Sequence, residues 1–110
     1  MKAVYKVDKP VLLQNEKGTA ARPNCTCGTW IDHWENLSGL KAGHCSVAGC
    51  EKEGTVGAHI TRPNAKNEAY KTHSYIVPMC KDHNGKHGEK LTSKSGVTFV
   101  WANIKETCGK

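Results

Sequence analysis

Two short segments of the chain each carry a pair of metal-ligand residues, and their spacing constrains the fold more than any other feature. Cys45 and Cys50 are separated by four residues, and Cys80 and His83 are separated by two. Structural zinc is bound by four Cys or His side chains in a tetrahedron, and short loops supply them two at a time. The intervening residues 51–79 are long enough to form a hairpin that lets the two pairs converge. The sequence therefore predicts a Cys3His site, zinc 1, made of Cys45, Cys50, Cys80 and His83.

The other three cysteines lie near the two ends of the chain. Cys25 and Cys27 form a Cys-x-Cys segment in a turn-rich stretch, and Cys108 is close to the C-terminus. Three thiols cannot all pair with one another as disulfides. Adding His33, six residues after Cys27, completes a second Cys3His set, zinc 2. In this set Cys108 would fasten the C-terminus to the N-terminal region.

Other interpretations of these residues stay open. Asp32 or His44 can replace His33 as the fourth ligand of zinc 2. Buried free thiols behave as small apolar side chains, and disulfides are a further alternative. The start of the chain carries charges and no apolar run of signal-peptide length, which predicts a cytoplasmic protein. In a reducing cytoplasm an even number of cysteines favours metal over disulfides.

The composition explains why metal ligands matter in this chain. It has 110 residues, of which 37% are hydrophobic, and a domain of this size buries only a modest share of its surface. No apolar stretch approaches the length of a membrane span, so no membrane partner is expected. A formal net charge of +6 is compatible with a polyanionic partner. The sequence does not indicate an oligomeric state.

Local patterns predict short strands and one clear helix. Trp30, Trp34 and Leu37 recur at helical spacing over residues 29–37, and Ser38-Gly39 ends this helix. The tryptophans are therefore expected in the core. Strands are expected over residues 4–13, with an edge at Pro10, and over 58–60, 75–78 and 97–102; residues 80–87 are expected to form a knuckle that leads into a helix.

The motifs occur in a familiar order. Cys45-x4-Cys50 is followed by Gly57-Ala-His-Ile60, then by Tyr75-Ile-Val-Pro-Met-Cys80, and then by His83-Asn84. Over about residues 44–90 this order resembles the HNH endonuclease family. Many members of that family clamp a β-hairpin to a helix with zinc knuckles, an arrangement called treble clef or ββα-metal.

The resemblance implies a fold class and a domain organisation. We expect an α+β fold, a small zinc-stabilised domain with an HNH-like treble-clef core of β-hairpin plus helix. The chain is interpreted as a single domain over residues 1–110. Its HNH-like zinc core is expected at 44–90, with 1–43 and 91–110 as flanking strands and helix packed on that core.

The resemblance also implies catalytic residues. His59 matches the histidine that deprotonates a water, and Asn84 or His87 matches the helical ligand of Mg²⁺ or another divalent cation. The chain departs from the family at two places. Ala58 stands where an Asp or His usually binds that cation. The second knuckle of the family is Cys-x2-Cys followed by His, whereas here Cys80-x2-His83 is followed by Asn84. His73 or His87 can compensate for Ala58. Alternatively, His59 is a buried histidine or a zinc ligand in place of His83, and Asn84 is a helix cap.

Two functions follow as hypotheses. The first is a zinc-binding HNH-like protein that interacts with nucleic acid, with metal-dependent nuclease activity left open by Ala58. The second is a catalytically degenerate treble-clef module that binds DNA, RNA or protein. Lysines 81, 86, 90 and 94 can form a phosphate-contacting stripe or simply a solvated face.

Overall fold

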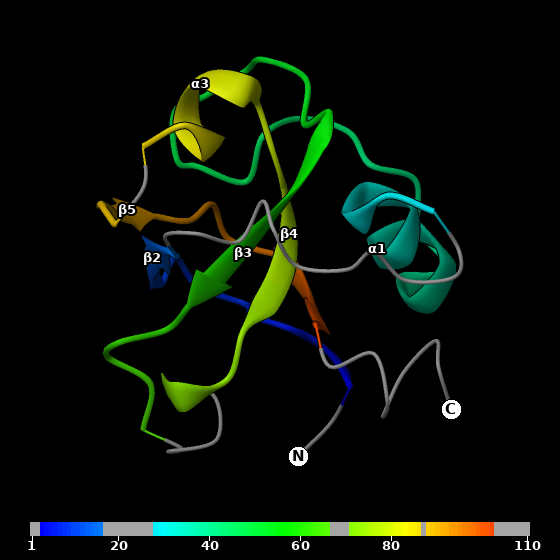
Figure 1. The fold of residues 1–110 in the computed structure, drawn as a ribbon. Coiled ribbons are helices and arrows are strands. Elements are labelled where there is room, and N and C mark those ends of the chain that lie inside the picture. Colours follow the sequence, from blue (N-terminus) through cyan, green and yellow to red (C-terminus); the bar gives the residue numbers. More distant parts are fainter. Residues whose placement is uncertain (1–2, 17–27, 67–70, 87, 103–110) are drawn as a thin grey trace.

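Six short strands among the described residues form one antiparallel sheet in the computed structural model of the protein (Figure 1). The structure describes residues 3–16, 28–66, 71–86 and 88–102. The strands lie across the sheet in the order β1-β6-β4-β3-β2-β5. The bounds of the elements are Val4–Lys6 (β1), Leu12–Asn15 (β2), Trp30–Ser38 (α1), Val56–Thr61 (β3), Tyr75–Met79 (β4), Lys81–Asn84 (α3), Lys90–Thr92 (β5) and Thr98–Trp101 (β6).

The β3–β4 hairpin lies at the centre of this sheet. Its register pairs His59 with Ile76 and Gly57 with Pro78. Every residue of β4 is buried, as expected for a short apolar strand that is covered on both faces. β6 pairs with the outer edge of β4, and β2 pairs with the outer edge of β3. Strands from both ends of the chain therefore extend the central hairpin on both sides.

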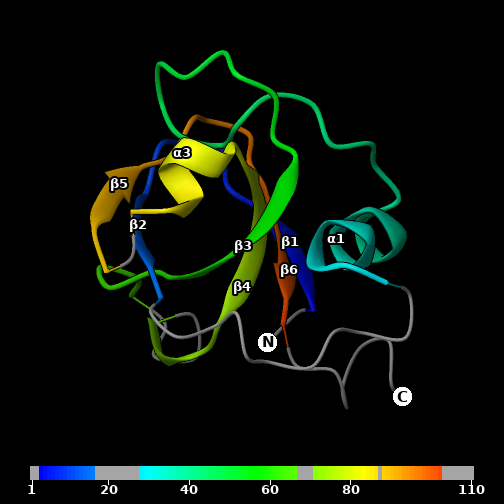
Figure 2. The ribbon, with the colours of Figure 1, turned by 45° about the horizontal axis from the view of Figure 1, so that its top comes forward.

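The alternation of side chains along β3 and β4 divides the core between the two faces of the sheet. On one face, Ala58 and Ile60 join the larger of two apolar clusters. The other buried members of this cluster are Val7, Leu13, Cys45, Val47, Tyr75, Val77, Met79, Cys80, Val97 and Phe99. On the opposite face, Ile76 and Val100 pack against Trp34 of α1. Figure 2 shows α1 and α3 on different sides of the hairpin.

Helix α1 is defined by local signals at both ends. A capping box begins it, because the Thr29 hydroxyl accepts from the Asp32 amide and the Asp32 carboxylate accepts from the Thr29 amide. Gly39 ends it in the left-handed conformation, with φ of 75°. The indole of Trp34 donates to the carbonyl of Thr98 at 2.9 Å. This bond fastens the middle of the helix to β6.

The predicted fold class is wrong, although the predicted helix over residues 29–37 is confirmed. We expected an α+β domain with an HNH-like treble-clef core of hairpin plus helix. The described chain is instead mostly a six-stranded antiparallel sheet, with one helix of nine residues and one of four. The reason is pairing between distant segments: β1 pairs with β6, and β2 pairs with β5 and β3. The strands outside the central hairpin join its sheet.

A test of the packing concerns Gly57, where α1 approaches β3 closely. A Cβ at this position would lie 2.5 Å from the carbonyl carbon of Trp30 and 2.6 Å from the amide nitrogen of Ile31. These are backbone atoms, so the helix itself would have to shift. We expect Gly57→Ala to lower the free energy of unfolding by about 1–3 kcal/mol, as overpacking does, measured by urea denaturation.

The matched control for this variant is Gly43→Ala. A Cβ at Gly43 has no heavy atom within 4 Å, so the substitution adds the same methyl group without a clash. Both variants reduce the conformational freedom of the unfolded chain in a similar way. Equal unfolding free energies for the two variants would contradict the close approach of α1 at Gly57.

Candidate metal centre

The loop over residues 45–50 is folded onto the sheet by backbone hydrogen bonds. The amide of Cys50 donates to the carbonyl of Val47 at 3.1 Å, which closes a tight turn between the two cysteines of the loop. The amide of Ser46 donates to the carbonyl of Pro78 at 2.9 Å. Because Pro78 is close to the end of β4, this bond places the first pair of ligands beside the second.

Cys80 and His83 are placed by the end of β4 and the single turn of α3. Cys80 is the N-cap of α3, with extended backbone angles φ −73° and ψ 161°. Its carbonyl accepts from the amide of Asn84 at 3.0 Å, which closes the turn. Residues three apart lie on the same side of a helix. The turn therefore presents the thiol of Cys80 and the imidazole of His83 to the same point.

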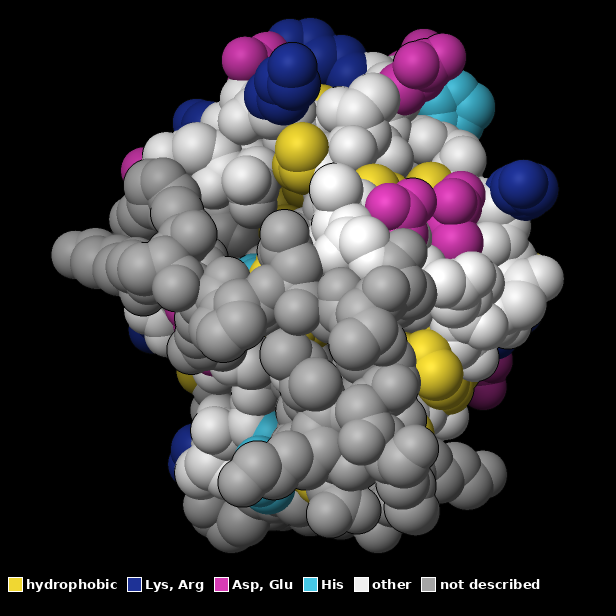
Figure 3. Space-filling view, turned by 45° about the vertical axis from the view of Figure 1, so that its right-hand side comes forward, with side chains coloured by type: hydrophobic (Ala, Val, Ile, Leu, Met, Phe, Trp, Pro, Cys, Tyr) yellow, Lys and Arg dark blue, Asp and Glu magenta, His cyan; other side chains and the backbone are white. Residues whose placement is uncertain are grey.

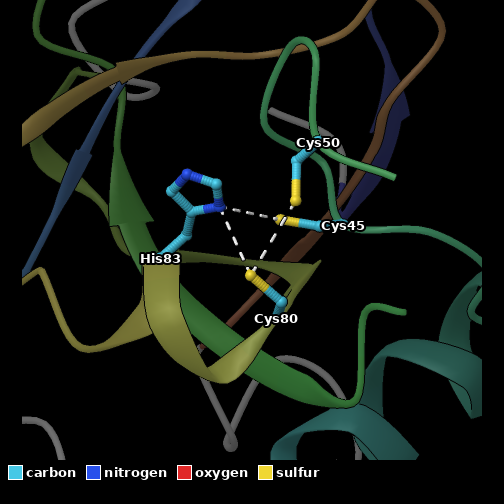
Figure 4. A group of neighbouring side chains, drawn as sticks. All are labelled: Cys45, Cys50, Cys80 and His83. Carbon is cyan, nitrogen blue, oxygen red and sulfur yellow. Dashed lines mark hydrogen bonds between the residues drawn. The ribbon is translucent and has the colours of Figure 1, made fainter. Parts of the chain in front are cut away.

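The four predicted ligands of zinc 1 point toward one another (Figure 4), and their ligand atoms all lie within 4.8 Å of one another. Nδ1 of His83 is 3.3 Å from Sγ of Cys80 and 3.6 Å from Sγ of Cys45. Sγ of Cys50 is 3.9 Å from Sγ of Cys80. Bond lengths to tetrahedral zinc imply S···N edges of about 3.6 Å and S···S edges of about 3.8 Å. The group could therefore hold a metal ion such as zinc.

The protein environment treats the thiols of this group differently. Burial raises the pKa of Cys45. Burial also acts to raise the pKa of Cys80, but hydrogen bonds from the backbone amide of His83 and from the thiols of Cys45 and Cys50 outweigh it, so the pKa of Cys80 is lowered. The thiolate is the form that ligates a metal. A bound divalent cation would favour the thiolate form of all three cysteines.

Two lysines that sequence reasoning did not connect with the site lie beside it. The ammonium of Lys94 donates to the carbonyl of Cys50, so this lysine of the predicted phosphate stripe is turned toward the metal ligands. Lys52 forms an exposed ion pair with Asp82 that joins the first loop to α3. Hydrogen bonding and charge within that pair raise the pKa of Lys52 and lower the pKa of Asp82. Three thiolates around one divalent cation would carry a net charge of −1, which the ammonium of Lys94 would offset, whereas the charge of Lys52 is already balanced by Asp82.

The predicted catalytic residues lie on different sides of the hairpin. The ring of His59 is buried edge-on against Trp30 of α1, with centroids 4.6 Å apart. Its neighbour Ala58 faces the larger apolar cluster on the opposite face, and Asn84 lies in α3, next to the Cys3His group. The structure thus does not bring His59 and Asn84 together around one cation. His87 lies outside the described residues, and the catalytic assignment stays a prediction.

Zinc 2 is described at only one of its predicted ligands, His33. Cys25, Cys27 and Cys108 lie outside the described residues. His33 is fully buried, and its Nε2 lies 2.8 Å from the carbonyl of Trp101. Burial lowers the pKa of His33 more than the hydrogen bond to the Trp101 carbonyl raises it. Because a carbonyl oxygen only accepts, this hydrogen bond requires a proton on Nε2. Its Nδ1 is buried and has no hydrogen-bond partner among the described residues. This orientation, with one ring nitrogen bound to a carbonyl and the other left over, is typical of a metal-ligating histidine.

The alternative ligands have other surroundings. The carboxylate of Asp32 is part of the capping box that begins α1. His44 is exposed and directly precedes the loop of the Cys3His group. His73, which we considered as compensation for Ala58, packs its ring edge-on against Trp101 at 5.4 Å. Because Cys25, Cys27 and Cys108 lie outside the described residues, the choice among His33, Asp32 and His44 for zinc 2 stays open.

The class of protein is defined by the fold and the site together. It is a small antiparallel β protein with a Cys3His group that could hold a metal ion such as zinc. Comparison with family models, curated proteins and solved structures gives no match for this chain. The HNH resemblance therefore stays a prediction. Among the described residues, no helix has the length and apolar character needed to cross a bilayer.

Cobalt(II) can test the geometry of the Cys3His group, because tetrahedral cobalt–thiolate sites absorb visible light strongly. We expect a cobalt titration of the metal-free protein to give this absorption. Even outer-shell changes weaken metal binding by about 10–100-fold, so removal of a ligand in Cys45→Ser is expected to weaken cobalt binding at least as much. Glu51→Ala changes an exposed residue directly after Cys50, and this control is expected to bind cobalt like the wild type. Unchanged affinity and spectrum in Cys45→Ser would contradict the proposed ligand set.

Proposed function

We propose that the chain is a zinc-dependent structural domain whose role is to bind nucleic acid. The observation that carries the zinc part of the proposal is the tetrahedral spacing of Cys45, Cys50, Cys80 and His83. These ligands come from two segments separated by the β3–β4 hairpin, so a shared ion would cross-link them. The nucleic-acid part rests on the net charge and on the resemblance of the motif order to HNH proteins.

Zinc is the metal that this ligand set favours. Three soft thiolates and one imidazole suit Zn²⁺ better than Mg²⁺ or Ca²⁺, which prefer oxygen ligands. With four protein ligands a tetrahedral zinc has no open position for water or substrate, which is typical of structural sites. Zinc at this site would therefore stabilise the fold and take no part in hydrolysis.

A second zinc is the finer part of the proposal. Its support is the buried His33, whose Nε2 is directed at the Trp101 carbonyl and whose Nδ1 has no hydrogen-bond partner within the described part of the chain. Cys25, Cys27 and Cys108 are proposed as its other ligands from their spacing in the sequence. Two metal ions per chain would support this second site. One metal ion per chain would contradict it and would leave only the site made of Cys45, Cys50, Cys80 and His83.

We place the proposed nucleic-acid contacts on exposed lysines in and near α3. The chain has 16 Lys and Arg against 10 Asp and Glu. On the face seen in Figure 3, basic and acidic side chains are interspersed, without a continuous basic surface among the described residues. Lys81, Lys86 and Lys90 are exposed in and after α3 and in β5. The proposal places phosphate contacts on these lysines, and it does not extend to hydrolysis because His59 and Asn84 lie apart.

Zinc removal is the direct test of the metal proposal. Structural zinc supplies folding free energy, with apparent values of about 10–16 kcal/mol in zinc-finger peptides. We expect elemental analysis to find zinc in the purified protein. A strong chelator is expected to abolish the cooperative thermal transition, and added zinc is expected to restore it. A protein verified as metal-free that keeps its dispersed amide spectrum and its Tm would contradict the proposal.

Fluorescence anisotropy with labelled single- and double-stranded oligonucleotides tests nucleic-acid binding. We expect log K to fall linearly with log salt, by about 0.9 for each phosphate neutralised on duplex DNA. The double variant Lys81→Glu with Lys90→Glu should weaken binding and reduce this slope. Lys9→Glu with Lys41→Glu makes the same charge change elsewhere and is the control. Equal losses in both double variants, or no binding at low salt, would contradict the proposed interface.

A further inference from the structure

Asn15, at the end of β2, makes an unusual set of hydrogen bonds to the segment that follows the metal ligands of α3. The residue is only 3% exposed. Its side-chain Nδ2 donates to the carbonyl of His83 at 2.7 Å and to the carbonyl of Lys86 at 3.1 Å. Its backbone amide donates to Glu89, and its carbonyl accepts from Gly88 at 2.9 Å. A residue of the N-terminal region is thus hydrogen-bonded to His83, Lys86, Gly88 and Glu89.

The segment held by Asn15 has little intrinsic stability. α3 has four residues, and isolated helices of this length do not persist in water. The last carbonyls of a helix lack partners within the helix. The amide of Lys86 supplies one donor to the carbonyl of His83 at 3.1 Å. The side-chain Nδ2 of Asn15 supplies a second donor to the same oxygen and also donates to the carbonyl of Lys86. It therefore fixes both ends of the turn that leaves α3.

The backbone of His83 directly controls the position of its ligand atom. His83 faces the three thiols with Nδ1, which is 3.3 Å from Sγ of Cys80 and 3.6 Å from Sγ of Cys45. Nδ1 is the ring nitrogen closer to the backbone, and only two side-chain torsions separate it from Cα. A small movement of the His83 backbone therefore displaces Nδ1 from the common point by a similar amount.

We infer that Asn15 is a positioning residue for the Cys3His zinc site, because it holds the backbone of His83 where Nδ1 meets the three thiols. This inference rests on the proposed zinc function. It extends the site beyond residues 44–90, because the residue that orients the fourth ligand belongs to β2. Asn15 is not proposed as a ligand.

A merely structural role for Asn15 is distinguishable from this one. The Oδ1 atom of Asn15 is buried and has no hydrogen-bond partner within the described part of the chain. Burying an unpaired acceptor costs free energy, so the amide is not an efficient way to stabilise the core alone. What the amide provides is two N–H donors with a fixed spacing, aimed at two carbonyls of one turn. Metal affinity and the spectrum of the bound metal are therefore the informative measurements.

The experiment compares zinc affinity in full-length variants by competition with a chromogenic chelator. Outer-shell partners of metal ligands contribute about 10–100-fold to affinity, and we expect a loss of this size in Asn15→Ala. Asn15→Asp keeps the size of the side chain but directs a carboxylate at two carbonyls, so it should bind zinc at least as weakly. The cobalt-loaded variants should show shifted visible bands, because the imidazole is no longer held in place.

Gln14→Ala is the matched control. Gln14 precedes Asn15 on β2, and its Nε2 donates to the carbonyl of Gly88 at 3.2 Å, so it contacts the same segment without contacting His83. We expect its zinc affinity and cobalt spectrum to match the wild type. Wild-type affinity and spectrum in Asn15→Ala, or an equal loss in Gln14→Ala, would overturn the inference.

The experiment also distinguishes failure of the proposed zinc function from failure of the role of Asn15. If the wild type binds no zinc, the proposed function itself fails, whereas a zinc-binding wild type with unaffected Asn15 variants overturns only the role of Asn15. If Asn15→Ala does not fold in excess zinc, the rate of zinc release is measured in Asn15→Ser, which keeps one donor. Faster release than in Gln14→Ala supports the inference, and an equal rate overturns it.

Discussion

The pairing of β3 with β4 is the interaction on which the rest of the structure depends. β4 is buried along its whole length, and its register with β3 decides which side chains reach each face. One face carries Ala58 toward the core that contains Cys45 and Cys80. The other carries Gly57 and His59 toward α1. A shift of one residue in this pairing would exchange the two faces, so the register fixes the metal group and the helix together.

The Cys3His group joins segments that the sheet alone leaves weakly connected. The loop over 45–50 reaches the end of β4 through the bond from Ser46 to Pro78, and α3 is a single turn. A cation shared by the four ligands would cross-link these short elements and stabilise their arrangement. The surrounding groups suit this role, since Lys94 lies against Cys50 and Asn15 holds the carbonyl of His83. The four ligands themselves come from the loop after α1 and from the start of α3, directly after β4.

Local patterns in the sequence were sufficient to predict some of these features. Helix α1 was predictable because its apolar spacing and its Gly39 terminus lie within a few residues of one another, and the two ligand pairs were predictable for the same reason. The sheet was not, because the pairing of Val4 with Val100 leaves no local trace. The face of His59 follows from strand alternation, which places it opposite Ala58. Asn15 gave no signal, since its bonding partners lie far along the chain.

The order of strands in the sheet has a consequence for how the protein is made. β1 and β2 are translated first, but their partners β6 and β5 are translated last, with Val4 opposite Val100 and Leu12 opposite Thr92. During synthesis the edges of β1 and β2 that pair with β6 and β5 therefore stay unpaired until the end, and unpaired strand edges are prone to association with other chains. The β3–β4 hairpin and the ligands beside it emerge before the sheet can close. The four metal ligands are therefore exposed to metal ions in the cell before the sheet is complete.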